Sequence, residues 1–208
     1  MRYHAPVLLL AALLSAPCAA AENQDAILRI EGAAMRLFDE MPLLVLDAAP
    51  DACGAGEGVN PRMAYCTTRN EILIWDTTGP SGQMGYELAH LYGHAVQVRH
   101  GVADVALREI RKRRDEEQKL RGWVTRQAEC IAGVIHSEAG LPDIALSDIF
   151  EAEPMTDSHW GRDPLHLGPK VSIGIEARDA WFAIGLRGDI AQCAVGEFES
   201  QLLTEALR

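Results

Sequence analysis

Two histidines four residues apart lie among small and apolar residues in the stretch MGYELAHLYGHAVQVRHG, residues 84–101. We predict a helix over residues 82–98, on which His90 and His94 lie one turn apart on the same face. Ala89 and Gly93 are small, so this helix can approach a neighbour closely. We expect that neighbour to be a second helix over residues 123–139, where apolar side chains recur at helical spacing.

The rest of the chain predicts an α+β fold that is mostly α-helical with a small β element. Helical spacing predicts further helices over residues 24–40, 104–121, 143–151 and 171–186, and in about the last 16 residues. EILIWD at 71–76 alternates in the manner of a strand, and PLLVLDA at 42–48 is a short apolar run typical of another. The mixed charges of residues 104–121 indicate a solvated helix.

The N-terminus has the three parts of a secretory signal. Arg2 and His4 precede an apolar run over residues 6–14, and the segment ends in three alanines, 19–21. We expect cleavage after Ala21, which leaves residues 22–208 as a single exported domain, periplasmic or secreted. The apolar run is shorter than the roughly 20 residues that span a bilayer, so we do not expect stable membrane insertion.

The chain is acidic, with a formal net charge of −11. Such a surface repels the phosphates of nucleic acids and of anionic lipids. We therefore do not expect nucleic-acid binding, and the charge gives a weak indication that a partner is basic.

Four cysteines follow the predicted signal, which allows three disulfide pairings in an oxidising compartment. Cys53 and Cys66 are close in sequence and flank a glycine-rich loop, so we pair them, and we therefore pair Cys130 with Cys193. A metal thiolate site is the alternative, although no C-x-x-C spacing supports it.

The histidine pair resembles part of the zinc-protease motif H-E-x-x-H, with Leu91 at the glutamate position. Two imidazoles at this spacing can bind one zinc ion. A catalytic zinc also needs a third protein ligand, an open position for water and a general base. The spacing alone leaves open whether His90 and His94 bind a metal or only pack in the helix.

A set of short fragments adds evidence through its order along the chain. The fragments are ACG at 52–54, YC at 65–66, ILIWD at 72–76, YELAHLYGHAVQ at 86–97, RQAECIAGV at 126–134, RDAWFAIGL at 178–186 and GDIAQC at 188–193. In this order the chain resembles the neutral zinc metallopeptidase family, zincins of the gluzincin type. The resemblance covers roughly residues 50–193, implies a zincin-like fold, and supports the Cys53–Cys66 pairing.

The resemblance implies that His90 and His94 are the first two zinc ligands and that Leu91 replaces the catalytic glutamate. The third-ligand segment of the family resembles E-L-Q-A-D-C, where this chain has TRQAEC. Thr125 therefore stands at the position of the ligand glutamate, and Glu129 stands where the family has aspartate. Leu91 and Thr125 thus replace a catalytic base and a metal ligand, so we expect impaired catalysis.

Other residues are candidates for the missing roles. Glu129 lies one turn after Thr125 and is a possible third ligand, or otherwise a carboxylate beside the site. His100 matches the spacing of the longer motif H-E-x-x-H-x-x-G-x-x-H, but Gln97 replaces its glycine. Glu87 lies one turn before His90. His166 falls in the loop over 151–169, where it could stabilise a transition state or only cap the chain.

Three functions follow from these patterns. The first, which we favour, is a degenerate metallopeptidase that binds a peptide or protein partner. In zincins the strand that corresponds to residues 71–76 can pair with an extended peptide. The second is an active zinc-dependent hydrolase with a rearranged site of His90, His94 and Glu129. The third is a structural envelope-associated domain without metal. Zinc is thus a possible cofactor: the second function requires it, the third lacks it, and the changed ligand set leaves it open whether the first retains it.

Overall fold

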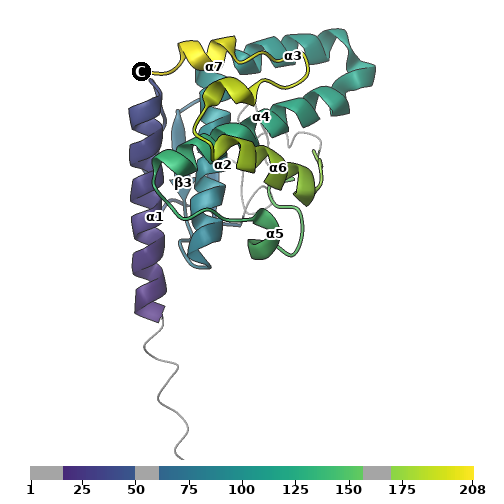
Figure 1. The fold of residues 1–208 in the computed structure, drawn as a ribbon. Coiled ribbons are helices and arrows are strands. Elements are labelled where there is room, and N and C mark those ends of the chain that lie inside the picture. Colours follow the sequence, from purple (N-terminus) through teal and green to yellow (C-terminus); the bar gives the residue numbers. More distant parts are fainter. Residues whose placement is uncertain (1–15, 50–60, 157–169) are drawn as a thin grey trace, which may run out of the picture.

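The computed structural model describes residues 16–49, 61–156 and 170–208. The helices are α1 (Ala16–Leu37), α2 (Ser81–Arg99), α3 (Val102–Lys112), α4 (Glu117–Glu138), α5 (Leu146–Ile149), α6 (Ile175–Gly185) and α7 (Gln201–Glu205). Two short 3-10 helices, Arg114–Glu116 and Ile190–Cys193, precede α4 and α7. The strands are β1 (Leu43–Val45), β2 (Met63–Cys66) and β3 (Glu71–Ile74). The prediction of a mostly helical α+β fold is therefore confirmed (Figure 1).

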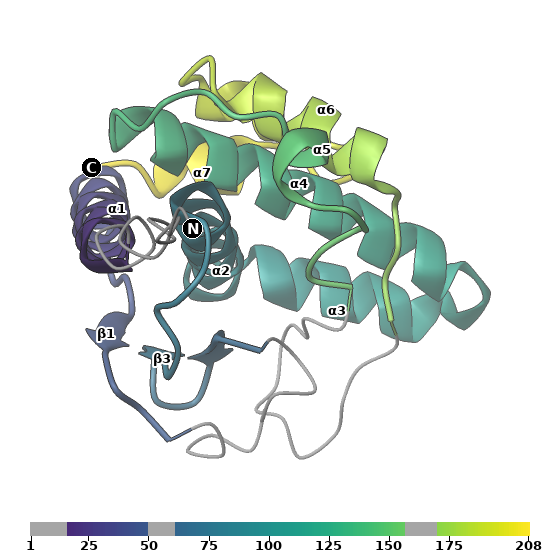
Figure 2. The ribbon, with the colours of Figure 1, turned by 90° about the horizontal axis from the view of Figure 1, so that it is seen from below.

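Helix α2 lies at the centre of the molecule. Figure 2 shows it between α1 and α4, with the small sheet below it. Every residue from 84 to 97 is buried, so this helix has no solvent-facing side over that stretch. The small residues allow this, as we expected, because a Cβ on Gly93 would come within 2.6 Å of the Ala128 carbonyl oxygen of α4. A helix that is covered all round positions its polar side chains inside the protein.

Helices α4 and α6 cross at glycines. A Cβ on Gly185 would overlap the carbonyl oxygen of Cys130, and a Cβ on Gly133 would overlap the carbonyl oxygen of Phe182. The disulfide Cys130–Cys193, across a sequence separation of 63, then ties α4 to the segment after α6. This predicted pairing is confirmed. Cys66 is also disulfide-bonded, and its predicted partner Cys53 lies outside the described residues.

The sheet has the order β1-β3-β2, with β1 parallel and β2 antiparallel to β3. The strands predicted at 42–48 and 71–76 are confirmed as β1 and β3, whereas β2 was missed. Since β3 is paired on both sides, the expectation that a peptide adds to this strand is wrong. Among the described residues the outer edges of the sheet belong to β1 and β2.

The single solvated helix predicted over residues 104–121 is also wrong. Helix α3 ends at Lys112, a 3-10 turn follows, and α4 begins at Glu117. Ala106 and Ile110 of α3 pack in a small second core with Leu120, Val124, Val195 and Phe198. The alanines of α3, which add little to an apolar pattern, complete the buried face.

No helix within the described ranges is both long enough and apolar enough to cross a membrane. Helix α1 begins at Ala16, so cleavage after Ala21 would shorten it at its N-terminal end. The cleavage itself stays a prediction.

The glycine crossing makes a testable prediction about stability. We expect Gly185→Ala to lower the free energy of unfolding by about 3 kcal/mol, because α4 and α6 must move apart to admit the methyl group. Gly82→Ala is the matched control, since its Cβ would make only ordinary contact with Ile149, at 3.6 Å. Urea unfolding of both variants is the measurement, and equal midpoints would contradict the crossing.

Candidate functional site

The two predicted zinc ligands lie together in the interior, on the side of α2 that faces α4. The rings of His90 and His94 meet edge to face, with 4.6 Å between their centroids. Both side chains are buried. The helical spacing thus places both imidazoles on one face of α2, as predicted.

Glu129 of α4 lies against this pair. Its Oε1 is 3.1 Å from Nδ1 of His90. The hydroxyl of Tyr86 donates to both carboxylate oxygens, at 3.1 and 3.0 Å. Neither ring nitrogen of His90 makes a well-directed hydrogen bond within the described part of the chain.

A guanidinium group completes the cluster. Arg178 of α6 is fully buried, and its Nη1 donates to Oε1 of Glu129. Its Nε donates to Oε1 of Glu153 at 2.8 Å. Glu153 is held in turn by the Ser172 hydroxyl and by the backbone amide of Ile173, at 2.9 Å. Arg178 therefore lies between two carboxylates from segments far apart in sequence.

The charges of this cluster stabilise one another. Burial acts to raise the pKa of Glu129, but the nearby His90 ring and the Arg178 guanidinium outweigh it, so the pKa is lowered. Burial acts to lower the pKa of Arg178, but Glu129, Tyr86 and Glu153 raise it. Burial, followed by the charge of Glu129, raises the pKa of Tyr86 well above its usual value. At neutral pH the cluster thus holds a carboxylate, a guanidinium and a protonated phenol.

His94 is held in a defined protonation state. Gln97 donates from Nε2 to the Val124 carbonyl at 3.0 Å and to Oε1 of Gln127 at 3.1 Å, so its own Oε1 faces Nδ1 of His94 at 3.1 Å. Burial, and then His90, lower the pKa of His94 well below its usual value. The neutral ring therefore carries its proton on Nδ1 and keeps the lone pair on Nε2.

As arranged, these side chains do not fit a zinc ion. The carboxylate of Glu129 already accepts hydrogen bonds from Tyr86 and Arg178. A divalent cation would also lie beside a buried guanidinium, where charge repulsion is strong. No group of three histidine, cysteine or acidic side chains in the described ranges is arranged to hold a metal.

The two replaced motif positions have structural roles. Leu91 is buried and belongs to the main apolar core. The hydroxyl of Thr125 donates to the Arg121 carbonyl oxygen one turn earlier on α4, at 3.1 Å. Neither side chain can accept a proton from water or bind a metal in this position.

The remaining candidates lie elsewhere. Nε2 of His100 is 3.1 Å from the Asp39 carbonyl oxygen, and its ring is beside Phe38, so it joins the end of α1 instead of the cluster. Glu87 forms an ion pair with Arg62 at 2.9 Å. His166 lies outside the described residues.

Sequence reasoning missed Arg178 and Tyr86. A signal for Arg178 was present, because Arg178, Phe182 and Gly185 recur at helical spacing and form the buried face of α6. An arginine in line with a phenylalanine and a crossing glycine indicates a buried cation, which needs an acidic partner.

Comparison with protein-family models, with curated proteins and with solved structures found no match to this chain. The zincin resemblance therefore stays a prediction.

The cluster predicts a pH-dependent cost for the loss of Arg178. We expect Arg178→Met to lower the free energy of unfolding by about 4 kcal/mol at neutral pH, because the Glu129 carboxylate is left buried without its cation. Its pKa then rises above the unfolded value of about 4.3, so the folded variant takes up a proton as the pH falls. The cost should shrink as the pH is lowered from about 7.5 to about 5.

The control is Arg36→Met, which removes the exposed ion pair between Arg36 of α1 and Glu138 of α4. It should lower the free energy of unfolding by at most about 1 kcal/mol. Urea unfolding at both pH values is the measurement. A cost for Arg178→Met that equals the control, or that grows at low pH, would contradict the ion pair.

Proposed function

We propose that this protein is an exported zincin-like module that does not hydrolyse peptides and that acts by binding a peptide or protein partner. The observation that carries the proposal is the buried ion pair of Arg178 with Glu129. Among the described residues, Glu129 is the carboxylate that lies against the histidine pair, and it neutralises an arginine.

Zinc binding at this cluster would require a rearrangement. Glu129 would have to release Arg178, which would leave a buried guanidinium with Glu153 as its remaining carboxylate. Breaking a buried ion pair costs about 3–5 kcal/mol. The free energy of zinc binding would have to exceed that cost for the site to be occupied.

The catalytic base is a second loss. Leu91 fills the position after His90 with an apolar side chain in the core. General-base catalysis contributes typically about 10²–10⁴-fold to such reactions. Glu87, the carboxylate one turn before His90, forms an ion pair with Arg62 and so is engaged elsewhere.

One observation favours the rearranged zinc enzyme as the second candidate. The hydrogen bond from His94 Nδ1 to Gln97 fixes the ring tautomer that metal-binding histidines use, with the proton on Nδ1. The neutral ring of His94 would suit zinc. This candidate requires that Glu129 exchange Arg178 for the metal.

The outer edge of β1 is the surface we propose for the partner. The Leu43 amide donates to the Asn70 carbonyl oxygen, so the amide of Leu44 points away from the sheet. Leu43 is 66 % exposed and Leu46 is 43 % exposed, beside this edge. An extended peptide could add a strand here and cover both leucines. The net charge of −11 favours a peptide that carries basic residues.

Zinc content tests the first part of the proposal. We expect the mature protein, purified without chelator or metal-affinity tag, to hold substoichiometric zinc and not to cleave casein when zinc is added. His90→Ala is the control and should behave in the same way. One zinc per chain that the control loses would overturn the proposal and establish the rearranged site.

Peptide selection tests the second part. We expect peptides selected from a random display library to bind at the β1 edge, and Leu43→Lys to weaken them at least about tenfold, because charge protects strand edges from pairing. Leu28→Lys is the matched control, since Leu28 is 55 % exposed on α1. Equal binding by the two variants, or no selected peptide, would contradict this surface.

A further inference from the structure

Four consecutive basic residues, Arg111, Lys112, Arg113 and Arg114, lie at the break between α3 and α4. Nowhere else in the sequence is a lysine or arginine next to another. The turn that they form projects at the right-hand edge of the molecule in both Figure 1 and Figure 2. Arg111, Lys112 and Arg114 are exposed, and Arg113 is partly buried. The run is thus presented to solvent at an outer corner of the fold.

The backbone leaves the helical conformation within this run. Helix α3 ends at Lys112, and Arg113 has φ −128° and ψ 66°, outside the helical region. Helix ends and exposed turns open locally at a low cost in free energy, and proteases nick folded proteins at such places. A protease that recognises basic side chains would therefore meet its substrate here.

An ion pair holds the turn against the rest of the protein. Arg113 donates from Nη1 to Oε1 of Glu197 at 2.9 Å and from Nη2 to Oε2 at 2.6 Å. Glu197 lies in the segment before α7, so this two-pronged contact joins the turn to the C-terminal part of the chain. A protease needs the turn extended and must wait for the contact to break. The ion pair thus sets how often the turn opens.

We infer that residues 111–114 are a site of limited proteolysis for an endoprotease that recognises consecutive basic residues, and that the Arg113–Glu197 ion pair controls access to it. All four basic side chains precede the peptide bond between Arg114 and Asp115. Cleavage hydrolyses this bond with one water and leaves a carboxylate on Arg114 and an amino group on Asp115. The inference does not rest on the proposed peptide edge or on zinc.

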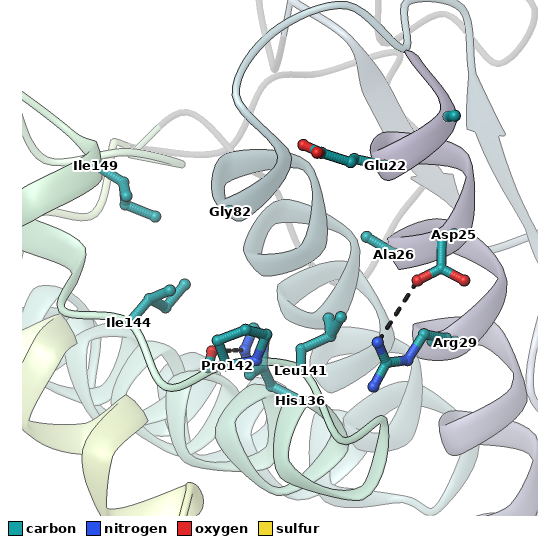
Figure 3. Close-up of a pocket in the computed structure, with 11 residues that line it drawn as sticks. Glu22, Asp25, Ala26, Arg29, Gly82, His136, Leu141, Pro142, Ile144 and Ile149 are labelled. Atoms are coloured by element: carbon teal, nitrogen blue, oxygen red, sulfur yellow. Dashed lines mark hydrogen bonds and ion pairs between the residues drawn. The ribbon is translucent and has the colours of Figure 1, made fainter. Parts of the chain in front are cut away.

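The two pieces on either side of the cut should stay together, because the main helix contacts cross between them. The first piece holds α1 to α3 and the second holds α4 to α7. Gly93 of α2 lies directly against the Ala128 carbonyl group of α4. Arg29 of α1 donates to the Ala139 carbonyl oxygen after α4 at 2.9 Å. Figure 3 shows that side chains of both pieces wall a cavity of about 690 Å³ between α1, the start of α2 and the end of α4.

Packing alone would hold the cut protein together. The disulfide Cys130–Cys193 lies within the second piece, and the predicted pair of Cys53 with Cys66 lies within the first. We therefore expect the pieces to co-elute in gel filtration and to separate in urea without a reducing agent. The unfolding midpoint of the cut protein should also rise with its concentration, as in any two-chain complex.

A furin-type endoprotease, which cleaves after Arg-x-Lys/Arg-Arg, is the probe. We expect brief treatment of the folded mature protein to give one cut, after Arg114, which mass spectrometry of the pieces identifies. Arg111→Gln should slow this cut at least about tenfold, because it removes one recognised side chain. Arg108→Gln is the matched control, since Arg108 is an exposed cation one turn earlier on α3 and lies outside the run.

A second pair of variants tests the control of access. Glu197→Gln weakens the contact with Arg113 and should speed the cut about twofold to fivefold, as expected for a partly exposed ion pair. Glu199→Gln should leave the rate unchanged, because Glu199 is exposed on the same segment and lies outside the ion pair. Circular dichroism checks that each variant is folded.

Three results would overturn the site: a first cut elsewhere in the chain, equal cleavage of Arg111→Gln and Arg108→Gln, and pieces that separate without denaturant. Equal rates for Glu197→Gln and Glu199→Gln would overturn the control by the ion pair. The protein that its source cells export should include chains that begin at Asp115. Only uncut chains in that material would overturn the use of the site in the cell.

Discussion

The guanidinium of Arg178 lies between the carboxylates of Glu129 and Glu153 in the interior of the protein, and the arrangement around α2 depends on it. A buried charge is tolerated only where opposite charge and hydrogen bonds compensate for lost water. Here Arg178 compensates two carboxylates at once, while Tyr86 supplies the remaining donor to Glu129. The carboxylate of Glu129 is therefore held by a guanidinium and a phenol beside the His90 ring.

This ion pair is possible only because two helices approach unusually closely. Gly133 and Gly185 let α4 and α6 cross with backbone against backbone. Arg178 lies two turns before Gly185 on the same face of α6, and Glu129 lies one turn before Gly133 on α4. The crossing fixes the register of the two helices and so aligns the charges. A side chain at either glycine would separate both the helices and the ion pair.

Much of the scaffold could be predicted from local patterns. The spacing of His90 and His94, the small residues beside them and the pairing of Cys130 with Cys193 each depend on nearby residues or on a short count. Arg178 and Glu129 are 49 residues apart, and no local pattern shows that one neutralises the other. Strand β2 was missed because its four residues gain their conformation from pairing with β3. The break between α3 and α4 was hidden by a continuous run of charges.

A zinc ion bound to His90, His94 and a residue of α4 would tie α2 to α4. In this protein the same helices are held by the close contact of Gly93 with Ala128 and by the hydrogen bonds of Gln97 to α4. Arg178 links α6 to α4 through Glu129, and Glu153 links the segment before α6 to Arg178. Within the part of the chain that the structure describes, direct contacts therefore join the same helices that a metal at this pair would join.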